Sequence, residues 1–433
     1  MKRITRKLSK LLLKSGGSSS RRRSNCSTPG TVSREPSIDV IPEDREPSSI
    51  QSCGESSAIP AAPPRPPLIP GLPDDLALQC LVRCPRHMFP TMGRVSKVWS
   101  EVITSEIFAE LRKDLGLLEP FLHVVEQRPR DGVCFIYSLD LSASRWKSVP
   151  CRVGNTLIDI PAGSECVVIG HRMIFLGGGT QWQSSNNVWC FDSALGRWFR
   201  LAPMLTARSS FACGVAGDQV FAVGGYGANG VALACAEVYD PETNAWQVIS
   251  DMKVARGGCL GVEQRGRFYV IGDTLVGDGG KVCREAEVYN PDMDTWLTLQ
   301  TKTWDLTLPP CPAFIDIDGP IRPKTAVLQG HLYAIDESGF PRLLHYDQRM
   351  NIWNIVCLLP NHSGDGANRF AMAAYGEELF IVGRKRVYSD SPEKSVEVCL
   401  PLSDDVRSSW RVPRQYAYGN FLNEIRACAV IEL

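Results

Sequence analysis

One nonapeptide pattern occurs twice in this 433-residue chain and restricts its fold more than any other feature. VYDPETNAW runs from Val238 to Trp246, and VYNPDMDTW runs from Val288 to Trp296, 50 residues later. Each copy places an aromatic residue and an Asp or Asn before a turn, and a tryptophan after it. A unit that recurs at about this period indicates a repeat architecture.

The pairing of an apolar residue with Asp or Asn, six positions before a tryptophan, recurs through the second part of the chain. It precedes Trp146, Trp198, Trp246, Trp296 and Trp353, and a slightly longer version precedes Trp410. Successive tryptophans are 52, 48, 50, 57 and 57 residues apart. This spacing is typical of propeller blades, with one blade for each repeat.

Each repeat also has the pattern of four short strands. In the third repeat the strands are SSFACGVA, QVFAVGG, CAEVYD and AWQVI, separated by turn-forming Gly, Asp and Asn. We expect the tryptophan to begin the outer strand and to wedge between neighbouring blades. A four-stranded sheet with two apolar faces buries both faces when blades stack in a ring.

Together, a glycine pair, an aromatic–Asp pair and a tryptophan resemble the kelch repeat over residues 121–433. The glycine pairs are Gly177 with Gly178 and Gly224 with Gly225. The resemblance implies an all-β propeller, and six tryptophans imply six blades. The first repeat has only three strands, and RACAVIEL, which ends at Leu433, is a strand left over. We expect this terminal strand to pair into the first blade, close the ring and remove exposed sheet edges.

A short helical module precedes the repeats, over residues 68–117. Pro73 stands where a first helical turn tolerates proline, and Asp74 and Asp75 follow where the helix dipole favours anions. Pro85 and Pro90 interrupt this helix. Two further helices are predicted over GRVSKVWSEVITS and over SEIFAELRKDLGL, the last with Ser105 as its N-cap.

The opening LPDDLALQCL and closing RVSKVW of this module resemble the F-box, whose members dock on the Skp adaptor of cullin-based SCF ubiquitin ligases. The chain is therefore all-α in this module and all-β in the propeller. By resemblance, the residues that face the adaptor are Leu72, Pro73, Leu76, Leu81, Val95, Trp99, Val102 and Ile103. The alternative is that these residues only cap the following domain.

The first 67 residues have the composition of a disordered tail and linker. Residues 1–34 carry ten basic side chains and no acidic one, and PAAPPRPPLIPG follows as a stiff spacer. A nuclear address near Arg21 or an organellar transit peptide are alternatives for the tail. The remaining chain has 37 basic against 47 acidic residues, which argues against nucleic acid as a partner. No apolar run reaches the roughly eighteen residues of a membrane span.

The sequence contains no pattern of catalytic or metal-ligating residues. The 16 cysteines are scattered singly, which favours a reducing compartment, and Cys80, Cys84 and His87 fall short of the four ligands of a structural zinc site. The histidines of the repeats lack paired ligand spacing. We therefore expect no enzymatic activity, no metal and no cofactor.

Four arginines are candidates for contact with a partner. Arg208 lies sixteen positions before Gly224, and Arg256 sixteen before Gly272, so both should enter their blades near the mouth of the channel. Arg369 and Arg426 also precede first strands. Resemblance to kelch propellers implies contacts with acidic partner segments. The alternative is that these arginines are solvated or bond to carbonyls of neighbouring blades.

The two modules together resemble plant F-box/kelch proteins. That resemblance implies a substrate-recognition subunit of an SCF-type ligase in the cytoplasm or nucleus, whose partners are a Skp-family adaptor, a cullin and a protein target. The other interpretations are a kelch scaffold or interaction protein unrelated to ubiquitin, or an organellar propeller imported by its basic tail.

Overall fold

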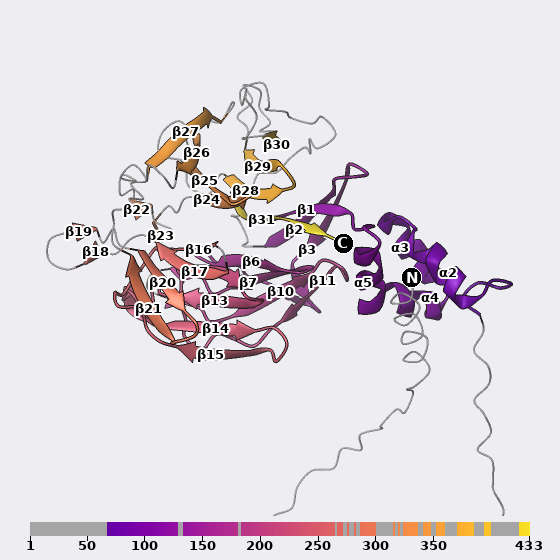
Figure 1. Ribbon diagram of the computed structural model, residues 1–433, viewed down its shortest axis with the longest axis horizontal. Coiled ribbons are helices and arrows are strands. Elements are labelled where there is room, and N and C mark those ends of the chain that lie inside the picture. Colours follow the sequence, from indigo (N-terminus) through magenta and orange to yellow (C-terminus); the bar gives the residue numbers. More distant parts are fainter. Residues whose placement is uncertain are drawn as a thin grey trace, which may run out of the picture. The chain divides into compact units, whose positions relative to one another are not determined.

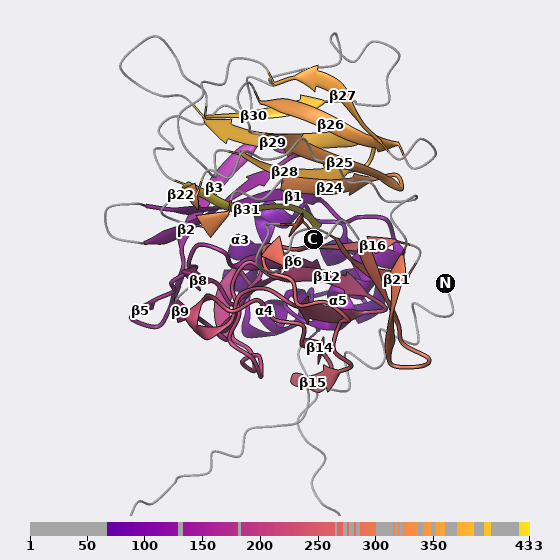
Figure 2. The same cartoon turned by 90° about the vertical axis from the view of Figure 1, so that its left-hand side faces the viewer.

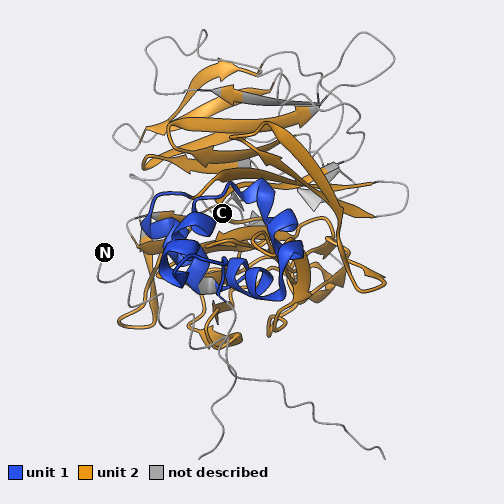
Figure 3. Cartoon of the chain, turned by 90° about the vertical axis from the view of Figure 1, so that its right-hand side faces the viewer, with its two compact units in different colours: residues 1–117 blue, residues 118–433 orange. Residues whose placement is uncertain are grey.

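The computed structural model describes most of the chain from residue 67 onward. The described residues are 67–128, 133–180, 183–264, 266–271, 275–276, 281–282, 286–299, 315–316, 319–320, 324–336, 341–347, 352–359, 370–384, 394–399 and 424–433. The chain separates into two compact units, residues 1–117 and 118–433 (Figure 3). The predicted tail, up to residue 66, lies outside the described residues.

Short helices make up the described part of the first unit. They are α2 (Asp74–Val82), the 3-10 turn η1 (Arg86–Met88), α3 (Phe89–Val95), α4 (Lys97–Ile103) and α5 (Glu106–Asp114). The prediction of one continuous helix through GRVSKVWSEVITS is wrong. Ser96 is extended (φ −154°, ψ 156°), and its hydroxyl accepts a hydrogen bond from Trp99 N, so it ends α3 and caps α4. Ser105 caps α5 as predicted, accepting from Phe108 N at 3.3 Å.

The helical unit has a hydrophobic core of its own. The buried residues are Leu68, Ala77, Leu78, Leu81, Val82, Met92, Val102, Phe108 and Leu111. Arg112 is also buried, and its guanidinium donates at 2.8 Å to the carbonyls of Val82 and Cys84, near the end of α2. This arginine therefore stabilises carbonyls that α2 itself leaves without partners.

The second unit consists of antiparallel sheets that follow the repeats. The first blade comprises β1 (Pro120–Gln127), β2 (Cys134–Asp140), β3 (Arg145–Pro150) and β31 (Glu424–Glu432). The second comprises β6 (Glu165–Ile169), β7 (Arg172–Leu176), β10 (Val188–Asp192) and β11 (Arg197–Arg200). The third comprises β12 (Ala212–Ala216), β13 (Gln219–Val223), β14 (Ala236–Asp240) and β15 (Ala245–Ile249).

The later blades repeat this order. The fourth comprises β16 (Leu260–Gln264), β17 (Arg267–Ile271), β20 (Ala286–Asn290) and β21 (Thr295–Leu299). The fifth comprises β24 (Lys324–Leu328), β25 (His331–Asp336), β26 (Arg342–Asp347) and β27 (Ile352–Leu358). A three-stranded sheet of β28 (Phe370–Tyr375), β29 (Glu378–Arg384) and β30 (Lys394–Cys399) follows, beside the fifth blade (Figure 2).

Two-stranded hairpins accompany the blades. They are β4 (Arg152–Val153) with β5 (Thr156–Leu157), β8 (Gly179–Thr180) with β9 (Gln183–Ser184), β18 (Leu275–Val276) with β19 (Lys281–Val282), and β22 (Ile315–Asp316) with β23 (Gly319–Pro320).

The described residues thus form five complete four-stranded blades, not the six predicted. The outer strand expected near Trp410, next to β30, lies outside the described residues. The pairing of the C-terminal strand is confirmed, because β31 runs antiparallel to β1 and places Leu122 opposite Val430 (Figure 1). Inner strands of successive blades contact one another, including β31 with β6, β6 with β12 and β28 with β31. The last strand of the chain therefore joins the first blade to its neighbours on both sides.

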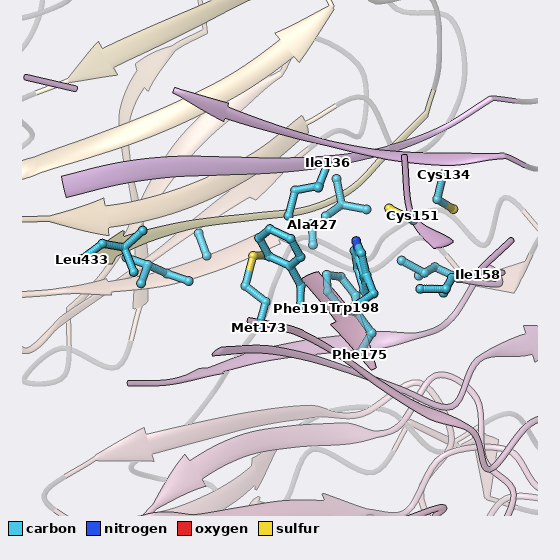
Figure 4. Packing of buried hydrophobic residues seen from close by; sticks show 14 residues of the cluster. Cys134, Ile136, Cys151, Ile158, Met173, Phe175, Phe191, Trp198, Ala427 and Leu433 are labelled. Carbon is cyan, nitrogen blue, oxygen red and sulfur yellow. The ribbon is translucent and has the colours of Figure 1, made fainter. Parts of the chain in front are cut away.

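Side chains of neighbouring blades interlock at the tryptophans. Trp198 packs against Phe175 and Phe191 of its own blade, with ring centroids 5.2 Å apart in both pairs. The same cluster includes Ile136 and Ala427 of the first blade (Figure 4). The predicted position of the tryptophan between blades is confirmed at this boundary.

Candidate interaction surfaces

The repeated nonapeptide joins each blade to the one before it. The Asn244 side chain accepts from the Tyr239 hydroxyl at 2.8 Å and from Ala202 N, in the preceding connection, at 3.1 Å. Trp246 Nε1 donates to the carbonyl of the same Ala202 at 3.0 Å. Asn244 has a φ of 51°, a conformation that Asn tolerates well. One motif therefore closes its own turn and fixes the adjacent blade.

The second copy makes the same set of contacts with Asp in place of Asn. Asp294 accepts from the Tyr289 hydroxyl at 2.9 Å and from Ser250 N at 2.9 Å, and Trp296 Nε1 donates to Ser250 O at 2.7 Å. Burial and the bond to Asp294 raise the pKa of Tyr289 to about 12. The tyrosine therefore remains a neutral hydrogen-bond donor at physiological pH.

The glycine pairs mark places where two backbones approach closely. Gly177 has a φ of 58°, and a Cβ at this position would lie 2.4 Å from the carbonyl oxygen of Arg208. Gly178 N donates to that carbonyl at 3.0 Å, and Gly225 N donates to the carbonyl of Arg256 at 2.7 Å. These bonds tie the loops at one end of a blade to the connection that enters the next blade.

Arg208 and Arg256 are fully buried, so neither side chain reaches a partner surface. Arg208 donates to Glu237 and to the carbonyls of Gly224, at 2.8 Å, and Cys235, at 3.1 Å. Arg256 pairs with Glu287 at 3.2 Å. The expectation that these two arginines contact a target is wrong. The carbonyls that Arg208 bonds lie in its own blade, not in a neighbouring blade as the alternative expected.

The glutamate partners were missed in the sequence, although a signal for them exists. Both lie in the tetrapeptide AEVY, at 236–239 and 286–289. Strand alternation places this glutamate on the same face as the tyrosine two residues later, and an aromatic residue on that face indicates burial, so the carboxylate requires a cation nearby. Glu237 is 29 residues after Arg208, and Glu287 is 31 after Arg256, so each arginine and its glutamate belong to one repeat.

The other two candidate arginines have different positions. Arg369 lies outside the described residues. Arg426, on β31, is partly buried and donates through Nε to Gln127 Oε1 at 2.8 Å. The amide nitrogen of Gln127 donates in turn to Asp159 Oδ1 at 3.3 Å. Gln127 therefore connects the candidate arginine to an exposed carboxylate on the connection between the first two blades.

Asp159 lies on the wall of a pocket of about 620 Å³. One side is formed by the connection that enters β6 and carries Leu157, Asp159 and Pro161. The other side is formed by residues 183–187, which include Gln183 and Asn187, and by Trp189 on β10. Asp159 is the one charged residue among the described residues that line this pocket.

The wall between β7 and β10 is held from outside the pocket. Asn186 Nδ2 donates to Met204 O at 3.0 Å, and Ser184 Oγ donates to Tyr226 O, in the third blade, at 2.8 Å. Arg200 donates to Asn187 Oδ1 at 2.6 Å, and its guanidinium lies 5.9 Å from the Trp189 ring centroid. Residues 184–187 are therefore held in place before any ligand binds, as is usual for ligand sites.

The eight candidate docking residues of the helical unit separate by exposure. Leu76 and Val95 are 45% and 62% exposed, and Pro73 is also exposed. Leu72, Trp99 and Ile103 are half-buried. Leu81 and Val102 belong to the core of the unit instead, so they were wrongly placed on the docking face. Met88, between Pro85 and Pro90, is a further large apolar side chain that is exposed.

Trp99 anchors the start of the described chain. Its Nε1 donates to Leu68 O at 2.7 Å, while Leu68 N donates to Asp74 Oδ1 at 2.8 Å.

Among the described residues no group of three His, Cys, Asp or Glu side chains could hold a metal ion. None of the helices described is long and apolar enough to cross a membrane.

Known proteins with similar sequences carry both the F-box and the kelch repeat in their names. The Kelch motif family model matches residues 161–205 and 207–253. F-box/kelch-repeat protein At1g67480 of Arabidopsis thaliana is 34% identical over 244 residues, which are 53% of this chain and 61% of that protein, so the match spans less than two thirds of its length.

Two further Arabidopsis thaliana proteins match over longer stretches. F-box/kelch-repeat protein SKIP4 is 26% identical over 321 residues, 73% of this chain and 82% of that protein. F-box/kelch-repeat protein At1g80440 is 30% identical over 350 residues, 78% of this chain and 93% of that protein. With its kelch β-propeller and its near full-length match to the last of these, the chain belongs to the F-box/kelch-repeat protein family.

Proposed function

We propose that this protein is the substrate-recognition subunit of an SCF-type cullin ubiquitin ligase. The helical unit is the F-box and docks on a Skp-family adaptor, and through it on a cullin. The kelch propeller binds a protein target. The chain performs no bond chemistry, and it acts by holding target lysines near the subunits that transfer ubiquitin.

The exposure of large apolar side chains on the helical unit carries this proposal. The unit buries a core of its own, yet Leu76 and Val95 remain in solvent. Neither side chain is needed to fill that core, so both are available to a partner. Apolar anchors that become buried on association supply much of the binding energy of protein interfaces. The F-box in the names of the relatives points to the Skp adaptor as the partner.

The propeller supports the second half of the proposal. Its loops are tied together by backbone hydrogen bonds such as Gly178 N to Arg208 O, and one loop cluster forms a pocket. Rigid strands that hold binding residues on loops are the common design of recognition domains. We place the protein in the cytoplasm or nucleus. Its cysteines are scattered singly along the sequence, as is usual for proteins of these reducing compartments.

Affinity purification from plant cells with cullin activity and the proteasome blocked tests the proposal. The tagged wild-type chain should recover a Skp adaptor, a cullin and the target. A Leu76→Lys, Val95→Lys double variant should lose the adaptor and the cullin but keep the target, because the propeller is unchanged.

The matched control introduces the same charges on the propeller. Val248 and Leu297, on the outer strands β15 and β21, are 69% and 45% exposed. A Val248→Lys, Leu297→Lys variant should recover the adaptor as the wild type does. If the wild type and the helical double variant recover equally little adaptor, the proposal is overturned in favour of a kelch scaffold unrelated to ubiquitin.

A further inference from the structure

The pocket formed by the connection that enters β6 and by the second blade combines apolar surface, amide groups and one carboxylate. Leu157 is 53% exposed on one side, and the half-buried Trp189 lies on the other. Exposed amide side chains, Gln183 and Asn187, stand beside the tryptophan. Apolar surface with a few placed polar groups is the usual composition of a ligand site, and the volume of about 620 Å³ is within the ordinary range.

The Asp159 carboxylate gives this pocket its charge. Asp159 is exposed, and its Oδ1 accepts a hydrogen bond from Gln127 Nε2 at 3.3 Å. Arg426 takes the oxygen of the same Gln127, so the amide nitrogen of that side chain is turned toward Asp159. The network orients the carboxylate without neutralising it by direct contact with a cation.

We infer that this pocket binds a short extended segment of the target protein, with a lysine or arginine against Asp159 and an apolar side chain between Leu157 and Trp189. The inference rests on the proposed function, which requires a polypeptide on the propeller. Amide side chains such as Gln183 and Asn187 offer both donors and acceptors, which match the peptide groups of an extended chain. A cationic side chain complements the single negative charge of the lining.

Of the candidate arginines in the described residues, Arg426 alone is linked to this pocket. The guanidinium groups of Arg208 and Arg256 bond to groups inside the blades. Arg426 instead bonds to Gln127, which in turn bonds to Asp159 in the pocket. Arg426 is thus a positioning residue for Asp159. The contact chemistry of this pocket is therefore acidic and apolar, and its one charged lining residue is an aspartate rather than one of the four candidate arginines.

A synthetic array of short peptides tests this inference with the full-length chain. The peptides differ at one position, which is lysine, norleucine or glutamate, next to a position that is leucine or serine. The wild type should retain the lysine–leucine peptides about tenfold more than the glutamate–leucine peptides, and should lose part of this binding when serine replaces leucine. Binding without a preference for the cationic peptides would overturn the inference.

Substitutions that change the charge of Asp159 test the inference more directly. Asp159→Lys should reverse the preference toward glutamate peptides, and Asp159→Asn should abolish the preference without reversing it. Glu242→Lys, on the exposed turn between β14 and β15, makes the same charge change elsewhere and should bind as the wild type does. Unchanged preference in the folded Asp159→Asn variant, checked by its melting temperature, would also overturn the inference.

Adaptor binding by the same variants separates this inference from the proposed function. Both Asp159 variants should bind the Skp adaptor with wild-type affinity. If adaptor binding is present but no peptide preference appears, the pocket assignment fails and the receptor function stands. If adaptor binding is absent in the wild type, the receptor function fails whatever the array shows.

Discussion

Arg208 and Glu237 form a fully buried ion pair in the third blade, with Nη2 of the arginine 2.8 Å from Oε1 of the glutamate. The other carboxylate oxygen accepts from Leu205 N at 2.7 Å, in the connection that enters the blade. Arg256 and Glu287 repeat the arrangement in the fourth blade. The pair thus fixes the path of the connection, and with it one end of the propeller.

Removing one partner of this ion pair should be costly. Arg208→Leu leaves the Glu237 carboxylate buried without its cation, which lowers the free energy of unfolding by about 3–5 kcal/mol. Urea denaturation of the purified chain measures the change. Arg197→Leu, at an exposed position on β11, is the control and should change it by less than about 0.5 kcal/mol. A loss as small as the control's would mean that the pair does not hold the connection.

The close approach at the glycine pair can be separated from its backbone conformation. Gly177 and Gly217 have φ values of 58° and 59°, but a Cβ meets the Arg208 carbonyl in the first case and nothing within 4 Å in the second. Gly217→Ala should therefore lower the free energy of unfolding by about 1 kcal/mol, because only the positive φ is unfavourable for alanine there. Gly177→Ala should cost clearly more, measured by urea unfolding. Equal losses would show that the two backbones separate freely at this point.

The C-terminal strand should contribute strongly to the stability of the propeller. Ile431 on β31 is buried in the cluster shared by the first and second blades. Ile431→Ala should lower the free energy of unfolding by about 2–5 kcal/mol, because it removes buried methyl groups at the closure. Val248→Ala, at an exposed position on β15, should have little effect. Comparable stability of the two variants would contradict the role of β31 in closing the ring.

A histidine pair on the fifth blade should make stability depend on pH. Burial lowers the pKa of His345, the neighbouring His331 lowers it further, and Asp347 opposes the shift. His331 Nδ1 and His345 Nε2 lie 3.0 Å apart. Protonation of His345 therefore favours the unfolded chain. The contribution of the neutral histidine to the free energy of unfolding is complete above the pKa of the unfolded chain, about 6.5. It is lost as the pH falls from that value through the lower pKa of the folded chain.

Thermal unfolding at about pH 7.5 and about pH 5 measures this dependence. His345→Gln removes the titrating group, so its melting temperature should fall less between the two pH values than that of the wild type. His87→Gln, at an exposed histidine of the helical unit, should keep the wild-type dependence. If the melting temperatures of the wild type and of His345→Gln fall equally between the two pH values, His345 is not the source of the pH dependence.

Most of the propeller could be predicted because its information is local and repeated. The spacing of Trp198, Trp246 and Trp296 predicts the blades, and the strand left over at the C-terminus predicts the closure through β31. The break at Ser96 could not be predicted from periodicity, since the apolar pattern of α3 and α4 continues across it. A single serine side chain, which bonds to Trp99 N, divides that pattern.

The site was harder to predict because exposure depends on contacts between distant residues. Arg208 was correctly assigned to the start of a blade, but its burial follows from Glu237, which lies on another strand of the same sheet. The pocket brings Asp159, on the connection that enters β6, together with Trp189 on β10, and no motif marks either residue. In the helices, Leu76 and Leu81 look alike in the sequence, although only Leu76 remains exposed.

Docking of the helical unit on the adaptor is the central claim, and isothermal titration of the full-length chain with a purified Skp adaptor tests it most directly. The wild type should bind in one-to-one stoichiometry. The Leu76→Lys, Val95→Lys variant should bind roughly 30-fold more weakly or worse, because each charge would be buried at the interface. No binding by the wild type, or equal affinity for this variant and for Val248→Lys, Leu297→Lys, would contradict the account.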